Sequence, residues 1–225
     1  MNTTNNKYAL HTVGSLSYLV REAKAGTINP PLLLLMHGVG SNELDMFSFS
    51  EHLPDNFLIL SAKAPYTVGP NSYVWFHVDF STGAPVFVEE EAESSRKIVI
   101  QFLESLKSHH SFDEKQVYLG GFSQGGIMSF SVGLTRPDLI KGIAVMSGRL
   151  LKEIRPFIAS TDKLSSLKIF ISHGLSDNVL NIEYARESCA YLKTLGLAPT
   201  YKEFVGGHAL PNEIWLDLIG WLKSE

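Results

Sequence analysis

The sequence has a single cysteine, Cys189, among 225 residues, so no disulfide can form within the chain. It also lacks a basic cluster, because 19 lysines and arginines stand against 23 aspartates and glutamates, for a formal net charge of −4. Nucleic acid is therefore not expected as a partner. No run approaches the ~18 apolar residues of a membrane span, and residues 1–6 are polar, unlike a signal peptide. These absences predict a cytoplasmic protein with no membrane span.

Short apolar runs recur along the chain, at residues 32–36, 57–60, 117–119, 143–146 and 169–171. Such runs suit strands that are buried on both faces. Helical patterns alternate with them at about residues 42–52, 91–109, 124–136, 183–195 and 211–223. The alternation predicts an α/β fold with a mostly parallel central sheet that is flanked by helices on both faces. We expect a last strand at 201–205, a hairpin strand within 8–21, and a single domain over residues 1–225, since no repeat or linker interrupts the sequence.

The pattern GFSQG at residues 121–125 follows one apolar run and opens a helical pattern. A serine at the tip of a tight strand-to-helix turn takes a strained backbone conformation, and its hydroxyl projects from the edge of the sheet. The residues two before and two after that serine must be very small, as Gly121 and Gly125 are. The pattern is typical of the nucleophile elbow of the α/β hydrolases, and it makes Ser123 the candidate nucleophile for acyl transfer.

A nucleophilic serine needs a base, and the base needs an acid that orients it. In hydrolases with this elbow the chain order is serine, acid and histidine, each on a loop that follows a strand. Asp177 follows the run at 169–171, and His208 follows the predicted strand at 201–205. We therefore predict that Ser123, Asp177 and His208 form a catalytic triad at one edge of the sheet.

Other side chains fit the roles of base and acid less well. His173 precedes Asp177 and comes directly after a strand, so we expect it to shape the loop that carries the acid. The remaining histidines precede Ser123, which is the wrong order. Asp138 and Asp162 follow the wrong strand ends.

Hydrolysis of an ester also requires donors for the oxyanion of the tetrahedral intermediate. The backbone amide of Gln124 is one candidate, because it follows the nucleophile and opens a helix whose dipole favours negative charge. The amide of Val39 is the other, in a loop at 36–42 whose glycines allow the backbone to approach a substrate closely. The two amides form the predicted oxyanion hole.

Four motifs carry a resemblance to a known family. LMHGVG at residues 35–40, GGFSQGG at 120–126, ISHGLSD at 171–177 and GGH at 206–208 are similar to the motifs of the phospholipase/carboxylesterase group, which includes acyl-protein thioesterases and broad carboxylesterases. The resemblance extends over roughly residues 30–222. It implies a compact α/β hydrolase without a large cap domain, with no cofactor, that hydrolyses carboxylic esters or thioesters. No metal site is expected.

The long connection at 62–90 is rich in aromatic residues, which could line a binding pocket or form a satellite hydrophobic cluster. Its segment VWFHVD at 74–79 resembles the family's tryptophan-containing segment, which implies that Trp75 and Phe76 bind substrate together with Gly38 of the oxyanion loop. A second long connection spans 148–166. Either connection could position substrate groups around the nucleophile.

Two departures from the family pattern bear on the substrate. The chain reads GSN at residues 40–42 where acyl-protein thioesterases usually have Gly-Asp, and no proline follows Asp177 in the way usual for them. We therefore predict a broad carboxylesterase that cleaves small-molecule esters and exists as a monomer or homodimer. A long-chain lysophospholipase or acyl-protein thioesterase, and a noncatalytic ligand-binding protein, are the alternatives.

Overall fold

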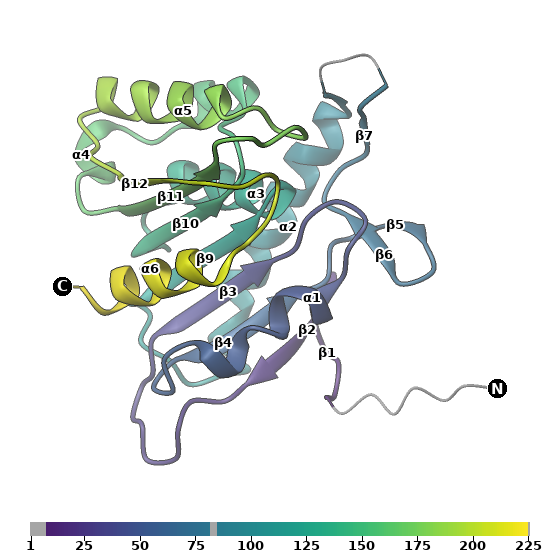
Figure 1. The fold of residues 1–225 in the computed structure, drawn as a ribbon. Coiled ribbons are helices and arrows are strands. Elements are labelled where there is room, and N and C mark those ends of the chain that lie inside the picture. The colour runs from purple at the N-terminus through teal and green to yellow at the C-terminus, as the bar shows by residue number, and fades with distance from the viewer. Residues whose placement is uncertain (1–7, 82–84, 225) are drawn as a thin grey trace.

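The computed structural model describes residues 8–81 and 85–224. Within these residues the central sheet has eight strands in the order β1-β2-β4-β3-β9-β10-β11-β12, drawn in Figure 1. The strands are β1 (His11–Val13), β2 (Leu16–Arg21), β3 (Leu32–Met36), β4 (Leu58–Ala62), β9 (Val117–Phe122), β10 (Gly142–Met146), β11 (Lys168–Gly174) and β12 (Thr200–Phe204). The six strands from β4 to β12 in this order pair in parallel. In this sheet β2 alone runs in the opposite direction, antiparallel to both of its neighbours, β1 and β4.

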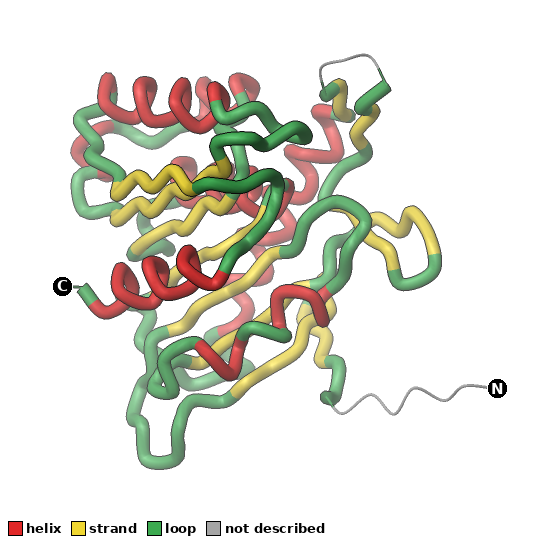
Figure 2. Tube along the Cα trace, in the orientation of Figure 1, coloured by secondary structure: helices red, strands yellow, loops and turns green. Residues whose placement is uncertain are grey.

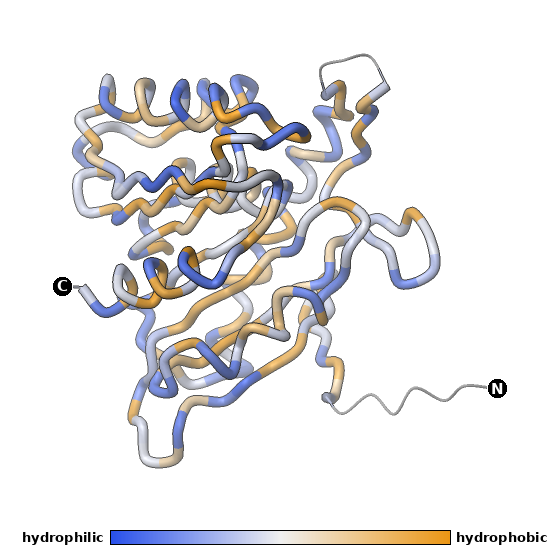
Figure 3. The backbone as a smooth tube through the Cα atoms, viewed as in Figure 1, coloured by the Kyte–Doolittle hydropathy of each residue, from blue (hydrophilic) through white to orange (hydrophobic). Residues whose placement is uncertain are grey.

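The parallel strands are apolar on both faces because both faces are covered. Leu32, Leu34 and Met36 of β3 pack into one hydrophobic cluster, and Leu33 and Leu35 pack into the other. The alternation follows from the two-residue repeat of a strand. Figure 3 shows the same apolar character along the central strands.

Helices fill the two layers. The helices are α1 (Glu43–Phe47), α2 (Glu89–Leu106), α3 (Gln124–Thr135), α4 (Thr161–Leu164), α5 (Glu183–Thr194) and α6 (Asn212–Lys223). Buried side chains of α2, α3, α4 and α5 belong to the first cluster, whereas those of α1 and α6 belong to the second. Figure 1 shows α1 and α6 in front of the sheet, with α2 and α3 behind it. The predicted α/β hydrolase architecture, with helices on both faces, is confirmed.

The structure corrects the predicted elements in detail. The helix expected over 42–52 is instead the short α1 followed by a 3₁₀ helix, η1 (Ser50–His52). Ser48 ends α1, and its hydroxyl donates to the carbonyl of Asp45 at 2.6 Å, a local bond that competes with helix continuation. Strand β9 runs three residues beyond the predicted 117–119, because Gly120 and Gly121 pair in the sheet although they carry no apolar signal. The region 8–21 forms the hairpin of β1 and β2.

The two long connections contain structure of their own. The first holds two small hairpins, β5 (Tyr66–Gly69) with β6 (Ser72–Val74), and β7 (Val78–Asp79) with β8 (Val86–Phe87), seen beside the sheet in Figure 2. Residues 82–84 of this connection lie outside the described residues. The second holds the 3₁₀ helix η2 (Lys152–Phe157) and α4. Across the described parts of the chain, no helix combines the length and the hydropathy that crossing a membrane requires.

Candidate active site

Ser123 occupies the turn between β9 and α3. Its backbone has φ 54° and ψ −115°, a positive φ that a residue with a side chain rarely adopts. Its amide donates to the carbonyl of Met146 on the next strand at 2.8 Å, which holds the turn against the sheet. The side chain lies at the carboxyl end of β9 and at the N-terminus of α3. This is the strained elbow conformation that the sequence pattern predicts.

The two glycines that flank the elbow have no room for a side chain. A Cβ atom on Gly121 would lie 2.2 Å from the carbonyl carbon of Gly125. A Cβ atom on Gly125 would lie 2.0 Å from the carbonyl oxygen of Met36. Both contacts are with backbone atoms, which cannot swing aside as a side chain can. The turn therefore depends on glycine at both positions.

Asp177 and His208 meet above the ends of two neighbouring strands. Asp177 follows β11, His208 follows β12, and Nδ1 of His208 lies 2.7 Å from Oδ2 of Asp177. The other carboxylate oxygen of Asp177 accepts hydrogen bonds from the amides of Val179 at 2.9 Å and Leu180 at 2.8 Å. The Asp177 side chain is fully buried. The carboxylate is thus fixed by its own loop, and it in turn orients the imidazole of His208.

Ser123 and His208 line one cleft, of about 410 Å³. Among the described residues no hydrogen bond joins their side chains, and the ring of His208 instead lies 4.7 Å from the ring of Phe122, centroid to centroid. Contacts between a nucleophile and its base are often loose without substrate and tighten when substrate binds. The arrangement brings the predicted acid and base together, and it places the candidate nucleophile in the cleft that His208 also lines.

His173 contacts the same carboxylate oxygen of Asp177 as His208 does. It is fully buried at the end of β11, with Nε2 at 2.7 Å from the carbonyl oxygen of Leu180 and at 3.2 Å from Oδ2 of Asp177. Burial lowers the pKa of His173, so the ring is neutral and its Nε2 proton is directed to Leu180. The ring braces the loop that carries Asp177, the structural role expected for it from the sequence.

Two backbone amides are free at the nucleophile. Within the described residues neither the amide of Val39 nor that of Gln124 donates a hydrogen bond. Gly38 lies against the nucleophile, because a Cβ atom there would be 3.4 Å from Cβ of Ser123. The loop is anchored next to it by the amide of Gly40, which donates to Tyr73 at 2.9 Å. Unpaired amides this close to a candidate nucleophile suit an oxyanion hole.

Trp75 has a different environment from the one that the resemblance implies. Its side chain is fully buried, it lines neither cavity at Ser123, and its Nε1 donates to the carbonyl of His37 at 3.0 Å. Its backbone amide donates to Oε1 of Gln124 at 2.7 Å. Trp75 therefore supports the loop at residues 36–42 from within the core. The prediction that it contacts substrate is not supported, because its ring is enclosed by the protein.

The Gln124 side chain joins the elbow to the segment that carries Trp75. Its Oε1 accepts from the amide of Trp75, and its Nε2 donates to the carbonyl of Phe76 at 2.7 Å. Phe76 then lines a small niche beside Ser123, and Gly38 lines the larger cleft. These two predicted substrate-binding residues therefore lie beside Ser123.

Several residues at the site were not predicted from the sequence. The niche has a volume of about 20 Å³, and its unpredicted lining residues include Phe80, Arg149 and Leu180. The cleft is also lined by Phe122 and Val179. Phe80 lies in the aromatic connection and Arg149 in the second long connection, so the length of both connections was the available signal. No motif distinguishes these residues from their neighbours.

The chain is similar in sequence to known esterases and thioesterases. A family described as phospholipase/carboxylesterase matches residues 23–224 of the chain. Acyl-protein thioesterase 1 of Mycosarcoma maydis is 34% identical over 121 residues, which span 51% of this chain and 50% of that protein. Carboxylesterase SOBER1 of Arabidopsis thaliana is 26% identical over 218 residues, 85% of this chain and 89% of that protein. The first of these matches therefore spans only half the length of the relative.

Solved structures share the fold. The crystal structure of esterase PE8 has a TM-score of 0.80 at 24% identity and covers 93% of this chain and 99% of its own. The Bacillus cereus carboxylesterase has a TM-score of 0.76 at 20% identity, with 92% and 93% covered. At these identities the likeness concerns the fold, which both structures share over nearly their whole length.

Proposed function

The chain belongs to the phospholipase/carboxylesterase family of α/β hydrolases, and we propose that it is a serine esterase that hydrolyses carboxylic esters or thioesters through an acyl-enzyme. The observation that carries the proposal is the 2.7 Å contact between His208 and Asp177 at the cleft that Ser123 also lines. The names of the relatives, carboxylesterase and acyl-protein thioesterase, agree with this class of reaction.

In the first step Ser123 attacks the carbonyl carbon of the ester while Nε2 of His208 takes the hydroxyl proton. Asp177 accepts from Nδ1 of His208, which fixes the tautomer with a free Nε2 and stabilises the imidazolium that forms. The amides of Val39 and Gln124 donate to the oxyanion of the tetrahedral intermediate. His208 then protonates the leaving alcohol or thiol, and the acyl group stays on Ser123.

In the second step water attacks the acyl-enzyme. His208 takes a proton from the water, the same two amides hold the second oxyanion, and the proton returns to Ser123 as the acid leaves. The reaction needs only the groups of the chain and water. Neither step calls for a cofactor.

The two cavities at Ser123 suggest which part of the ester goes where. His208 must reach the leaving group to protonate it, and His208 lines the cleft of about 410 Å³ but not the niche of about 20 Å³. The leaving group therefore occupies the cleft, and the acyl group enters the niche. A cavity needs roughly 10–15 Å³ to hold one water molecule, so the niche suits a short acyl group. The size of the niche favours the small-ester carboxylesterase over the long-chain thioesterase.

Hydrolysis of p-nitrophenyl esters from acetyl to palmitoyl by the wild type and Ser123→Ala tests this function. We expect turnover that depends on Ser123 and is greatest for short acyl groups. Turnover that is greatest for long acyl chains would instead identify the protein as a lysophospholipase or an acyl-protein thioesterase. No turnover of any ester or thioester would favour a noncatalytic binding protein. A cytoplasmic location, and a monomeric or homodimeric state, stay predictions.

A further inference from the structure

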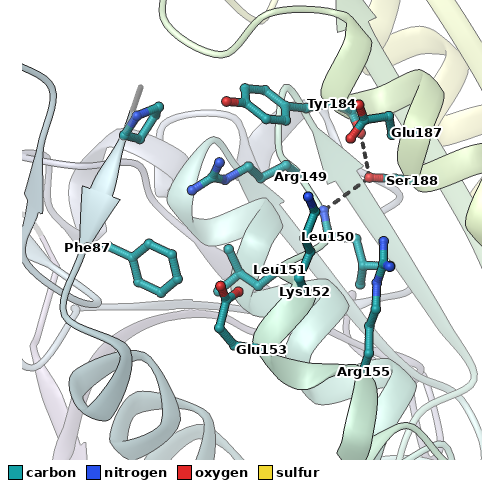
Figure 4. Close-up of a pocket in the computed structure, with 11 residues that line it drawn as sticks. Phe87, Arg149, Leu150, Leu151, Lys152, Glu153, Arg155, Tyr184, Glu187 and Ser188 are labelled. Carbon is teal, nitrogen blue, oxygen red and sulfur yellow. Dashed lines mark hydrogen bonds between the residues drawn. The ribbon is translucent and has the colours of Figure 1, made fainter. Parts of the chain in front are cut away.

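Arg149 presents its guanidinium group at the carboxyl end of β10. The side chain lies between two aromatic rings, with Cζ 4.9 Å from the ring centre of Tyr184 and 5.8 Å from that of Phe87. Figure 4 shows the three side chains together on the wall of a groove. Rings on either side of a guanidinium hold it in place and reduce its hydration. Arg149 is therefore a positioned cation.

This cation has no anionic partner in the described part of the chain. Arg96, Arg136 and Arg186 pair with carboxylates at 2.7–3.0 Å, and Arg21 donates to four backbone carbonyls. Arg149 has no carboxylate within 4.0 Å, and its Nε is buried without a hydrogen-bond partner. A guanidinium fork that is held in place and left unpaired is suited to a carboxylate from outside the chain.

Arg149 also borders two cavities. It lines the niche beside Ser123 and the neighbouring groove of about 280 Å³. Pro85 lines both cavities as well. A short acyl group that enters the niche from Ser123 therefore comes within reach of Arg149, which also forms part of the wall of the groove.

The charges around the groove favour an anion. Two acidic residues line it, Glu153 and Glu187, and both are exposed. Lys152 and Arg155 balance their charges, and Arg149 then gives the residues that line the groove a formal net charge of +1. Neither glutamate lies within ion-pair distance of Arg149.

We propose that Arg149 selects esters whose acyl group ends in a carboxylate, that is, monoesters of short dicarboxylic acids. The acyl carbonyl is attacked by Ser123, the chain passes along the niche, and the distal carboxylate pairs with the guanidinium of Arg149. This inference rests on the proposed function, since the acyl side of the site is defined by Ser123 and His208. It adds the substrate class, which the family relationship does not supply.

The test compares matched anionic and neutral esters. The monoethyl esters of malonic, succinic and glutaric acids each have a neutral counterpart in which the free carboxylate is a carboxamide of nearly the same shape. Release of ethanol gives kcat/KM for each member of a pair. The wild type should prefer the carboxylate by about tenfold or more in at least one pair, because a charge-assisted bond with a guanidinium is about twice as strong as a neutral one.

Variants identify the cation responsible. Arg149→Met should reduce the preference for the carboxylate to about one, and Arg149→Lys, which keeps the charge but not the fork, should retain only part of it. Arg136→Met is the matched control, because Arg136 caps the opposite end of α3 from Ser123; it should keep the wild-type preference. The preference of the wild type tests the proposal even if a variant at Arg149 does not fold.

The outcomes separate this inference from the proposed function. Equal rates on the carboxylate and carboxamide esters by the wild type would overturn the role of Arg149 while leaving serine-dependent hydrolysis intact. A preference that survives in Arg149→Met would overturn it as well, by assigning the selection to another group. Loss of turnover on both kinds of ester in the wild type would instead contradict the proposed function.

Discussion

Nε2 of His173 lies 3.2 Å from Oδ2 of Asp177. The same carboxylate oxygen lies 2.7 Å from Nδ1 of His208, so one oxygen faces two imidazole rings. His173 is fully buried, and the resulting desolvation lowers its pKa. The ring thus contributes no positive charge that would compete with His208 for the carboxylate, and it acts by packing and by its bond to the loop.

Replacing His173 should reduce turnover through Asp177. His173→Gln removes the ring that packs against the carboxylate, and small displacements of a catalytic group can cost up to ~100-fold in rate. We expect kcat on a short-chain ester to fall by about 10-fold to 100-fold, with KM little changed. His109→Gln, an exposed histidine at the end of α2, is the matched control. Full kcat in a destabilised His173→Gln would mean that the ring only fills space.

Gln124 should contribute to stability as well as to the site. Its side chain pairs with the amide of Trp75 and the carbonyl of Phe76 inside the protein. Gln124→Met keeps the side-chain length but leaves both backbone groups unpaired, which costs roughly 1–3 kcal/mol for each group. We expect the free energy of unfolding in urea to fall by about 2 kcal/mol or more. The control is Gln101→Met, at an exposed glutamine. An equally small change in the free energy of unfolding in both variants would contradict the role of the Gln124 hydrogen bonds.

The same residues show what the sequence can and cannot predict. The elbow could be predicted because its requirement is local, with Gly121 and Gly125 pressed against backbone within a few residues of Ser123 or against the adjacent strand. Asp177 and His208 could be placed because each follows a strand of a parallel sheet, and such strands end at one edge. These inferences depend on where the strands end along the chain, and the apolar runs in the sequence indicate those positions.

Trp75 and Arg149 could not be placed in this way. Both lie in long connections whose path depends on tertiary contacts, such as the bond from Nε1 of Trp75 to the carbonyl of His37. A count of aromatic residues does not tell which ring faces the core and which faces a substrate. Arg149 matters because it lines the niche beside Ser123 without a carboxylate partner, and no pattern in the sequence indicates this.

Stability should depend on pH through His37. Its ring is fully buried, with Nδ1 donating to the carbonyl of Gly38 at 2.8 Å and Nε2 accepting from the amide of Ala64 at 3.1 Å, and desolvation lowers its pKa to about 4. The unfolded chain binds this proton near pH 6.5, whereas the folded chain stays neutral until about pH 4. The free energy of unfolding should therefore fall as the pH drops through this window, by at most about 3 kcal/mol from His37.

Urea unfolding at pH 7, 6 and 5 measures this dependence. His37→Gln should show a shallower loss of stability with falling pH than the wild type, because the group that protonates in the unfolded chain is gone. Above pH 6.5 both proteins should be insensitive to this group. Identical slopes in the two proteins would show that His37 does not resist protonation in the fold.

Two glycines should respond in opposite directions to the same substitution. Gly125→Ala places Cβ 2.0 Å from the carbonyl oxygen of Met36, so we expect a loss of at least ~3 kcal/mol in unfolding free energy. Gly220 lies within α6, where an added Cβ atom would meet no neighbouring atom within 4 Å. Gly220→Ala should stabilise the protein by about 0.5–1 kcal/mol. A tolerated Gly125→Ala would contradict the close approach of the elbow to β3.

Covalent labelling identifies the nucleophilic serine directly. The protein is incubated with a fluorophosphonate, and the modified residue is located by peptide mass spectrometry. We predict one adduct, on Ser123, that is absent in Ser123→Ala and present in Ser129→Ala, which changes a buried serine further along α3. An adduct on a different serine, or ester turnover that persists in Ser123→Ala, would contradict this prediction.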